Sequence, residues 1–128
     1  MIAYLDRDDV LTVAARVLDG NPGVRDIGLL DAAIARPQST VFGLDTYRTV
    51  FDKAAALLHS LARNRALVDG NKRTAWASAW LFLGYNGVSL ASKFDVDAAE
   101  VFMNDVAMGL DDMHRIAATL REFSEQQK

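Results

Sequence analysis

The sequence predicts an all-α fold, a bundle of helices around one central, buried helix. Apolar residues recur at helical spacing in several segments, and turn pairs such as Asn86-Gly87 separate those segments. The segment 74–84 is apolar almost all round, which is typical of a helix in the middle of a bundle. At 128 residues the chain is long enough to bury a core, so we expect a single domain over residues 1–128.

The N-terminal half is expected to hold one short strand and three helices. Alternation within residues 1–5 suggests the strand. A helix over 6–19 begins with acidic capping groups, and a shorter one starting near residue 27 ends at or before Pro37, because the residue before proline avoids helical angles. After a loop, an apolar stripe from residue 50 predicts a long third helix.

The C-terminal half begins with the predicted central helix. Residues 88–90 follow it as a second short strand, and their pairing with residues 2–5 would give a minor two-stranded β pairing. Two further helices are expected over 95–108 and 111–125, the second capped by an aspartate.

Composition argues against several classes of protein. The formal net charge of −3 disfavours a general nucleic-acid surface, and the absence of cysteine excludes disulfides and thiolate metal sites. The longest apolar run, 75–83, is far shorter than the roughly 20 residues of a membrane span, and the acidic first residues are unlike a signal peptide. We therefore expect a cytoplasmic protein without a membrane partner or a direct nucleic-acid partner.

Five small or polar residues, Asp69-Gly70-Asn71-Lys72-Arg73, separate two predicted helices. Gly70 has no Cβ and can adopt positive φ, which lets the backbone approach a ligand. If a helix begins near Asn71, its first N–H groups lack partners within the helix and, with the helix dipole, attract an anion. Lys72 and Arg73 add two cations, and an arginine can donate two parallel hydrogen bonds to a phosphate. The segment therefore suggests a polyphosphate site.

Asp69, before the glycine, would complement such a site. Mg²⁺ is commonly bound by one or two carboxylates, with water and phosphate oxygens as its other ligands. A simpler interpretation also fits, because Asp-Gly is a common turn, asparagine a common cap, and a Lys-Arg pair is often only solvated. Cations at a helix N-terminus oppose the helix dipole, so two of them there favour a bound anion.

The stretch RALVDGNKRTA, residues 65–75, resembles the signature loop of the Fic/Doc superfamily, whose pattern is His-x-Phe-x-(Asp/Glu)-(Ala/Gly)-Asn-(Lys/Gly)-Arg. Its Asn-Lys-Arg ending is similar to the Doc toxin branch. The AMP-transferring Fic branch has Asn-Gly-Arg and a second arginine three residues on, where this chain has Lys72 and Trp76. The upstream segment GVRDIGLLDAAIARPQ is also similar to Doc-like proteins, so the resemblance extends over about residues 9–120.

The resemblance implies a helical domain that binds ATP and Mg²⁺ at this loop. Doc toxins of the family transfer the γ-phosphoryl group to a threonine hydroxyl of elongation factor Tu and thereby stop translation. Carried onto this chain, catalytic Asp69 would hold Mg²⁺, and Gly70, Asn71 and catalytic Lys72 would bind the phosphates. Arg73 would bind phosphate or brace the loop. The family also implies an antitoxin partner, whose C-terminal segment folds into a hydrophobic groove of the toxin.

Position 65 departs from the family pattern. The motif histidine, the family's general base, falls at Arg65, and Leu67 replaces the usual phenylalanine. A guanidinium stays protonated and only donates hydrogen bonds, so it cannot accept a hydroxyl proton. Losing a general base typically costs about 10²- to 10⁴-fold in rate. His59 should face away from position 65 on the same predicted helix and His114 lies outside the motif, so we expect impaired catalysis.

Three functional interpretations stay open. The first is a Doc-like serine/threonine protein kinase of a toxin–antitoxin pair, disabled at Arg65. The second is an AMP-transferring Fic protein, although Lys72 in place of glycine would crowd the α-phosphate. The third is a module that binds nucleotide or a partner without turnover. Arg65 is either a substitution that disarms a toxin so that its host can make it or the mark of a naturally inactive relative, and it could instead be a solvated helix-end arginine. Trp76 and Trp80 belong either to the core or to a ligand pocket.

Overall fold

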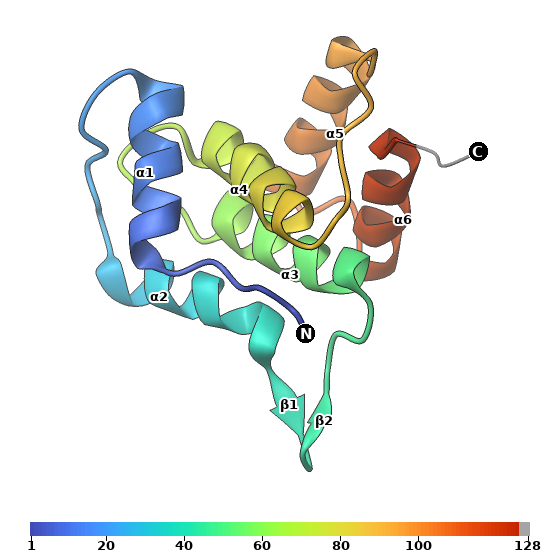
Figure 1. Cartoon of the computed structure of the whole chain (residues 1–128). Helices are drawn as coiled ribbons and strands as arrows, with labels where there is room; N and C mark the ends of the chain where they lie inside the picture. Colours follow the sequence, from blue (N-terminus) through green and yellow to red (C-terminus); the bar gives the residue numbers. More distant parts are fainter. Residues whose placement is uncertain (126–128) are drawn as a thin grey trace.

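The computed structural model describes residues 1–125, and these form six α-helices, one 3₁₀ turn and one β-hairpin (Figure 1). The elements are α1 (Arg7–Leu18), α2 (Ile27–Ala35), η1 (Arg36–Gln38), β1 (Thr40–Val41), β2 (Leu44–Asp45), α3 (Val50–Arg63), α4 (Asn71–Tyr85), α5 (Val96–Ala107) and α6 (Met113–Phe123). None of these helices is long and apolar enough to cross a membrane. The predicted all-α class with a minor two-stranded sheet is confirmed; residues 126–128 of the predicted domain lie outside the described residues.

The most buried helix is α3, whereas the sequence indicated the following one. Ten of the fourteen residues of α3 are buried, against six of the fifteen in α4. α3 packs against α2, η1, α4, α5 and α6, and Figure 1 shows it at the centre with α4 crossing it. α4 is less buried because its first turn, with Lys72 and Arg73, is exposed. The bundle therefore has a central helix, but the sequence placed it one helix too late.

Five of the helices begin with a side chain that accepts a hydrogen bond from an N–H group of the first turn. The capping residues are Asp6, Asp26, Thr49, Asp95 and Asp112. Such caps satisfy donors that have no partner within the helix. α4 differs, because its N-cap is Gly70 and no side chain accepts from its first turn.

The predicted pairing of residues 2–5 with 88–90 is wrong. The N-terminal segment forms no strand; the side-chain amide of Asn86 instead accepts from the N–H of Ala3 and donates to its carbonyl, both at 2.9 Å. Leu90 forms an isolated bridge with Ser124. One side chain therefore fixes the N-terminal segment where the sequence suggested a second strand.

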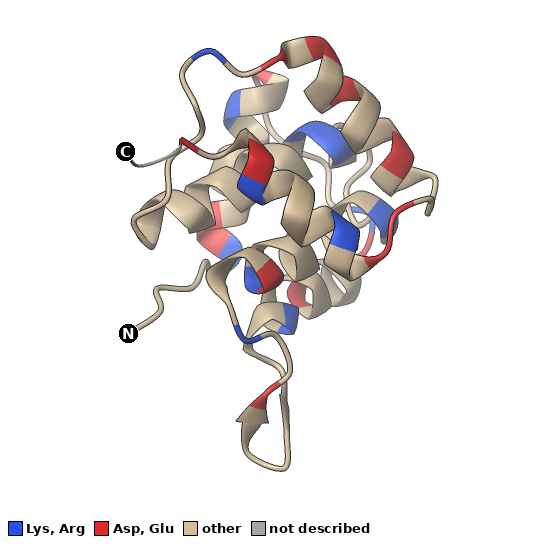
Figure 2. Cartoon of the chain, turned by 90° about the vertical axis from the view of Figure 1, so that its right-hand side faces the viewer, with Lys and Arg blue, Asp and Glu red and all other residues tan. Residues whose placement is uncertain are grey.

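The observed strands form a hairpin that projects from the bundle, in a segment predicted to be a loop (Figure 1). Phe42 and Gly43 make its turn, both with positive φ, and Phe42 is fully exposed. Figure 2 shows that the tip carries no charged residue. Only the base is anchored to the bundle: the buried Lys53 of α3 donates to Asp45 at 3.1 Å and to the carbonyl of Tyr47.

Arg36 completes the anchor of the hairpin. Its guanidinium donates to the hydroxyls of Tyr47 and Ser60 and to Nδ1 of His59, each at 2.8 Å. Because an arginine only donates, Nδ1 of His59 must be unprotonated here. Burial, and then the charges of Arg36 and Arg63, lower the pKa of His59 below its ordinary value of 6.5.

Both tryptophans of α4 belong to an aromatic cluster at the edge of the core. The ring of Trp76 lies between 5.4 and 6.4 Å, centroid to centroid, from those of Trp80, Phe94, Phe102 and Phe123. The core interpretation therefore holds for the pair, and Trp76 in addition lines a surface hollow next to α5.

Candidate functional site

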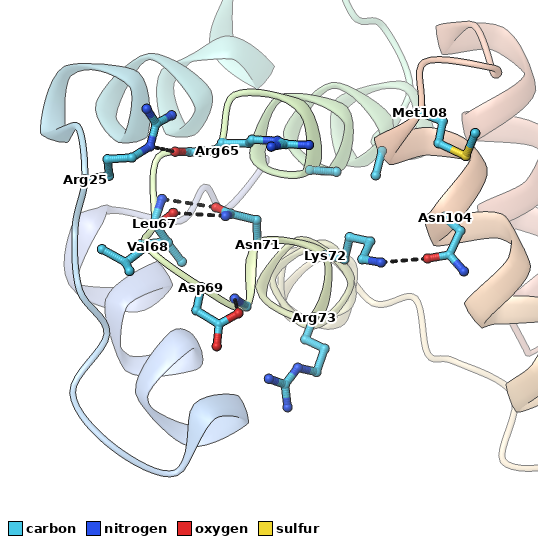
Figure 3. Close-up of a pocket in the computed structure, with 13 residues that line it drawn as sticks. Arg25, Arg65, Leu67, Val68, Asp69, Asn71, Lys72, Arg73, Asn104 and Met108 are labelled. Atoms are coloured by element: carbon cyan, nitrogen blue, oxygen red, sulfur yellow. Dashed lines mark hydrogen bonds between the residues drawn. The ribbon is translucent and has the colours of Figure 1, made fainter.

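The polar segment 69–73 lines a hollow between the end of α3, the start of α4 and the end of α5. The hollow has a volume of about 860 Å³. Arg65 extends into it from the α3 side, and Arg25 and Asn104 add side chains from the α1–α2 connection and from α5 (Figure 3). The residues expected to act together from sequence are therefore brought together in one cavity.

Main-chain hydrogen bonds tie the loop before α4 to the α1–α2 connection. Val68 donates its N–H to the carbonyl of Gly23 at 2.8 Å. The carbonyl of Ala66 accepts from the two N–H groups of residues 25–26, at 2.8 and 3.1 Å. The loop is therefore fixed by a segment that is remote in sequence.

Gly70 cannot carry a side chain in this structure. Its φ is 74°, and a Cβ built there would lie 2.4 Å from Cδ2 of Leu18. Positive φ and close packing both require glycine at such a position. Leu18 of α1 occupies the place of that Cβ, while Gly70 still lines the hollow, and its predicted role in phosphate binding stays a prediction.

The side chain of Asn71 braces the loop. Its Oδ1 accepts from the N–H of Leu67 at 3.1 Å, and its Nδ2 donates to the carbonyl of the same residue at 3.0 Å. The side-chain amide is therefore engaged within the loop. Its predicted role in phosphate binding stays a prediction.

The start of α4 has unused hydrogen-bond donors. Within residues 1–125, the backbone N–H groups of 71–73 donate to no acceptor. Donors of the first helical turn, together with the positive end of the helix dipole, favour an anion. The absence of a capping side chain is thus what leaves α4 able to bind one.

Cationic side chains surround these donors, and none of them pairs with a carboxylate among the described residues. They are Arg25, Arg65, Lys72 and Arg73. Lys72 donates to Oδ1 of Asn104 at 2.8 Å, and Arg73 donates to the carbonyl of Val17 at 3.2 Å. Asp69 is the one acid among the described residues of the lining. The hollow is therefore positive although the chain has a net charge of −3.

Asp69 is exposed at the mouth of the hollow. Its Oδ1 accepts from the N–H of Gly70 at 2.8 Å. The described residues contain no group of three or more His, Cys, Asp or Glu side chains that could hold a metal ion. A lone carboxylate beside a phosphate site nevertheless fits Mg²⁺, which takes water and phosphate oxygens as its other ligands.

Arg65 lies beyond the end of α3 and has a φ of 51°, in the left-handed region. The guanidinium of Arg25 holds this backbone: its Nε donates to the carbonyl of Arg65 at 2.7 Å and its Nη2 to that of Asn64 at 3.3 Å. The expectation that position 65 continues the helix of His59 is therefore wrong, because α3 ends at Arg63.

Neither histidine lies in the hollow. His59 is on α3 and contacts Arg36, and His114 is exposed on α6. His59 thus faces away from the site, as the sequence indicated. The reason is not helical rotation between positions 59 and 65, because α3 ends at Arg63. The described residues that line the hollow include Arg65 and no histidine, and the correspondence of position 65 to the motif histidine stays a prediction.

Two polar side chains of the lining were not singled out from the sequence. Arg25 falls within the upstream segment that is similar to Doc-like proteins, but nothing in that segment indicated a clamp on residues 64–65. Asn104 is 32 residues from Lys72, its hydrogen-bond partner, and no local pattern marks it. Only the packing of α5 beside α4 reveals its position.

A second hollow, of about 530 Å³, lies between α4 and α5. It shares Lys72, Arg73 and Asn104 with the first, and its other walls are mostly apolar, including Trp76 and Val96. Val96 is 64% exposed, which is unusual for valine in a folded chain. The cationic hollow therefore continues into an apolar groove.

A model of the Fic/DOC family matches residues 4–83. The chain belongs to the Fic/Doc family. It is 62% identical over 124 residues to Toxin Doc of Mycolicibacterium smegmatis (strain ATCC 700084 / mc(2)155), which covers 97% of this chain and 95% of that protein. It is 36% identical over 104 residues to Protein kinase doc of Escherichia phage P1, covering 81% of this chain and 79% of the phage protein. The predicted family and its Doc-like branch are confirmed.

Proposed function

We propose that this chain is a Doc-type toxin whose cationic hollow binds ATP with Mg²⁺, and whose reaction class is phosphoryl transfer to a protein hydroxyl. The observation that carries the proposal is the set of four cations without carboxylate partners in the described residues, gathered around an uncapped helix start. Phosphoryl transfer depends mainly on positioning and charge neutralisation, which such a site supplies. The phage relative is named a protein kinase, which supports the reaction class, and the mycobacterial relative is named a toxin, which supports the biological role.

Different residues of the hollow have different proposed roles. Lys72, Arg73 and the N–H groups of the first turn of α4 bind the phosphates, and Gly70 and the Asn71 amide keep the loop in shape. Asp69 would hold Mg²⁺, which neutralises charge on the phosphates when bound. The family suggests a threonine of elongation factor Tu as acceptor, and translation as the process stopped.

Transfer by this chain is expected to be weak. The acceptor hydroxyl must lose a proton, and Arg65 cannot take it because a guanidinium has no lone pair to offer. Asp69 is the one acid in the described lining, and its proposed task is the metal. Loss of general-base assistance costs about 10²- to 10⁴-fold in rate.

A second part of the proposal concerns an antitoxin. A C-terminal antitoxin segment would lay an apolar helix face into the groove beside Trp76 and Val96. Because this groove shares Lys72 and Arg73 with the cationic hollow, its occupant would also shield the phosphate site. We expect Val96→Asp to weaken co-purification with the product of the adjoining gene, whereas unchanged capture would place the antitoxin elsewhere.

The decisive experiment compares this chain with its Arg65→His variant. Each is incubated with Mg²⁺, γ-labelled ATP and elongation factor Tu, and label transfer is measured. Transfer by the histidine form, at a rate about 10²- to 10⁴-fold above that of the arginine form, is the expected result. No transfer by either form would reject the proposed acceptor, and α-labelled ATP would then test AMP transfer.

One alternative has direct support, a module that binds nucleotide without turnover. It is favoured by the lack of a proton acceptor at position 65. It predicts measurable ATP affinity in both forms but no label transfer from either, even after Arg65→His. Label transfer by the histidine form would exclude it.

A further inference from the structure

We infer that Arg65 is a phosphate ligand of the hollow, so that position 65 binds an anion where the family pattern has a proton acceptor. The inference rests on the proposed nucleotide site and adds a charged contact of two hydrogen bonds, which a neutral histidine with its single N–H donor could not supply. A guanidinium can donate two parallel hydrogen bonds to phosphate oxygens, and it remains charged at every working pH. The substitution would then alter what the site holds as well as what it catalyses.

The side chain of Arg65 is available for such a contact. It is exposed, and it forms no hydrogen bond or ion pair with another described residue. The other three cations of the lining each donate to a protein oxygen: Arg25 to main-chain carbonyls, Lys72 to Asn104 and Arg73 to a carbonyl of α1. Arg65 is therefore the cation of the described lining with all its donors unused.

The backbone at position 65 directs this side chain into the hollow. The left-handed φ of 51° turns the chain away from the axis of α3, and Figure 3 shows the side chain of Arg65 extending between α3 and the end of α5. Arg25 maintains that turn through its bonds to the carbonyls of residues 64 and 65. Arg25 is thus the positioning residue, and Arg65 is the ligand that it positions.

The excess of positive charge in the hollow also favours a bound phosphate. Four cationic side chains and one acidic side chain line the hollow, and like charges repel one another. A bound polyphosphate removes this repulsion and gains from each cation, so the arrangement is most stable when the anion is present. Arg65 raises the positive charge of the site beyond what Lys72 and Arg73 provide in the family motif.

The test is the affinity of the whole chain for two probes, ATP and inorganic triphosphate, measured calorimetrically at pH 8 without Mg²⁺. The variants are Arg65→Gln, Arg65→His and Arg65→Lys. Arg48→Gln, which removes one charge at the other end of α3, is the matched control. We expect Arg65→Gln and Arg65→His, whose side chains are neutral at this pH, to lower the affinity for both probes about tenfold. Arg65→Lys should lower the affinity less, and the control should bind both probes like the unsubstituted chain. High salt should shrink these differences.

The outcomes separate the two proposals. If the unsubstituted chain and Arg65→Gln bind both probes equally well, Arg65 is not a phosphate ligand, but the proposed nucleotide site is retained. If only ATP binding weakens, Arg65 contacts the nucleoside and the phosphate assignment is rejected. If the unsubstituted chain binds neither probe, the proposal of a nucleotide site is itself rejected. Equal Tm values for the variants would show that affinity, not folding, has changed.

Discussion

Two glycines with nearly the same backbone conformation stand in opposite surroundings. Gly70, before α4, has a φ of 74°, and Gly43, at the hairpin tip, has a φ of 78°. A Cβ at Gly70 would lie 2.4 Å from Leu18, whereas a Cβ at Gly43 would meet nothing within 4 Å. The local requirement is the same, but one turn is packed into the body of the protein and the other projects from it.

The two regions also differ in how their polar groups are satisfied. The loop before α4 is bonded internally through Asn71 and externally to the α1–α2 connection. The hairpin is anchored to the bundle at its base, through Lys53 and Arg36, and its tip is exposed. A site that orients phosphates gains from being fixed in advance, because less ordering is left to the moment of binding.

The largest difference between the two regions is expected when each glycine is replaced by alanine. Gly70→Ala combines an unfavourable φ with a clash, so we expect a loss of about 2–4 kcal/mol in the free energy of unfolding and loss of ATP binding. Gly43→Ala has only the conformational penalty, about 1 kcal/mol. Urea unfolding of both variants measures the difference. Equal losses would mean that the contact with Leu18 does not restrain the loop.

Removing the amide of Asn71 tests whether the loop is held in advance. Asn71→Ala leaves the N–H and carbonyl of Leu67 without their partners, which should cost about 1–3 kcal/mol and weaken ATP binding. Asn86→Ala is the matched control, because that amide braces the N-terminal segment far from the hollow. Both variants should lose stability, but only the first should lose affinity. Equal affinities would argue that the brace is not needed.

The hairpin anchor should respond to pH through His59. Its pKa is lowered in the folded state, so the unfolded chain binds the proton more readily. Stability is therefore fully present above the ordinary pKa of about 6.5 and falls as the pH drops from there toward the folded-state value. His59→Gln keeps an acceptor for Arg36 but does not titrate, so its Tm should fall less between pH 7 and pH 5. Parallel curves for the two proteins would contradict this role.

The smallest effect is expected at the hairpin tip. Phe42 is fully exposed, so Phe42→Ser should change the free energy of unfolding by no more than about 0.5 kcal/mol. The matched core change is Phe82→Ser, at a residue with 1% exposure, which should cost several times more. A large loss at Phe42 would show that the tip packs against the bundle in solution.

The sequence predicted the helices well because their boundaries depend on local chemistry. Asp6, Asp26 and Asp95 cap helices as capping propensities indicate, and Gly70 starts α4 close to where a start was expected. The central helix was misplaced because α3 buries Lys53, a residue that periodicity counts as polar. The predicted strands do not form, because the side-chain amide of Asn86 bonds the N–H and the carbonyl of Ala3, which a strand partner would otherwise bond.

The site was predictable in its residues but not in its geometry. Asp69 to Arg73 follow a local motif, so their grouping is visible in the sequence. The left-handed turn at Arg65 depends on Arg25, which lies 40 residues earlier, and the bond from Lys72 to Asn104 depends on the packing of α5. Such contacts arise from tertiary structure, and no spacing rule within one segment anticipates them.

The bonds between the α1–α2 connection and the loop before α4 have a consequence for hydrogen exchange. The amides of Asp26 and Val68 lie outside regular helices, yet each donates to a carbonyl of the facing segment. Each segment can release its protons only when the other moves away, so the two should open together with a single opening free energy. A ligand that touches only the start of α4 would then slow deuterium uptake at Asp26, which does not line the hollow.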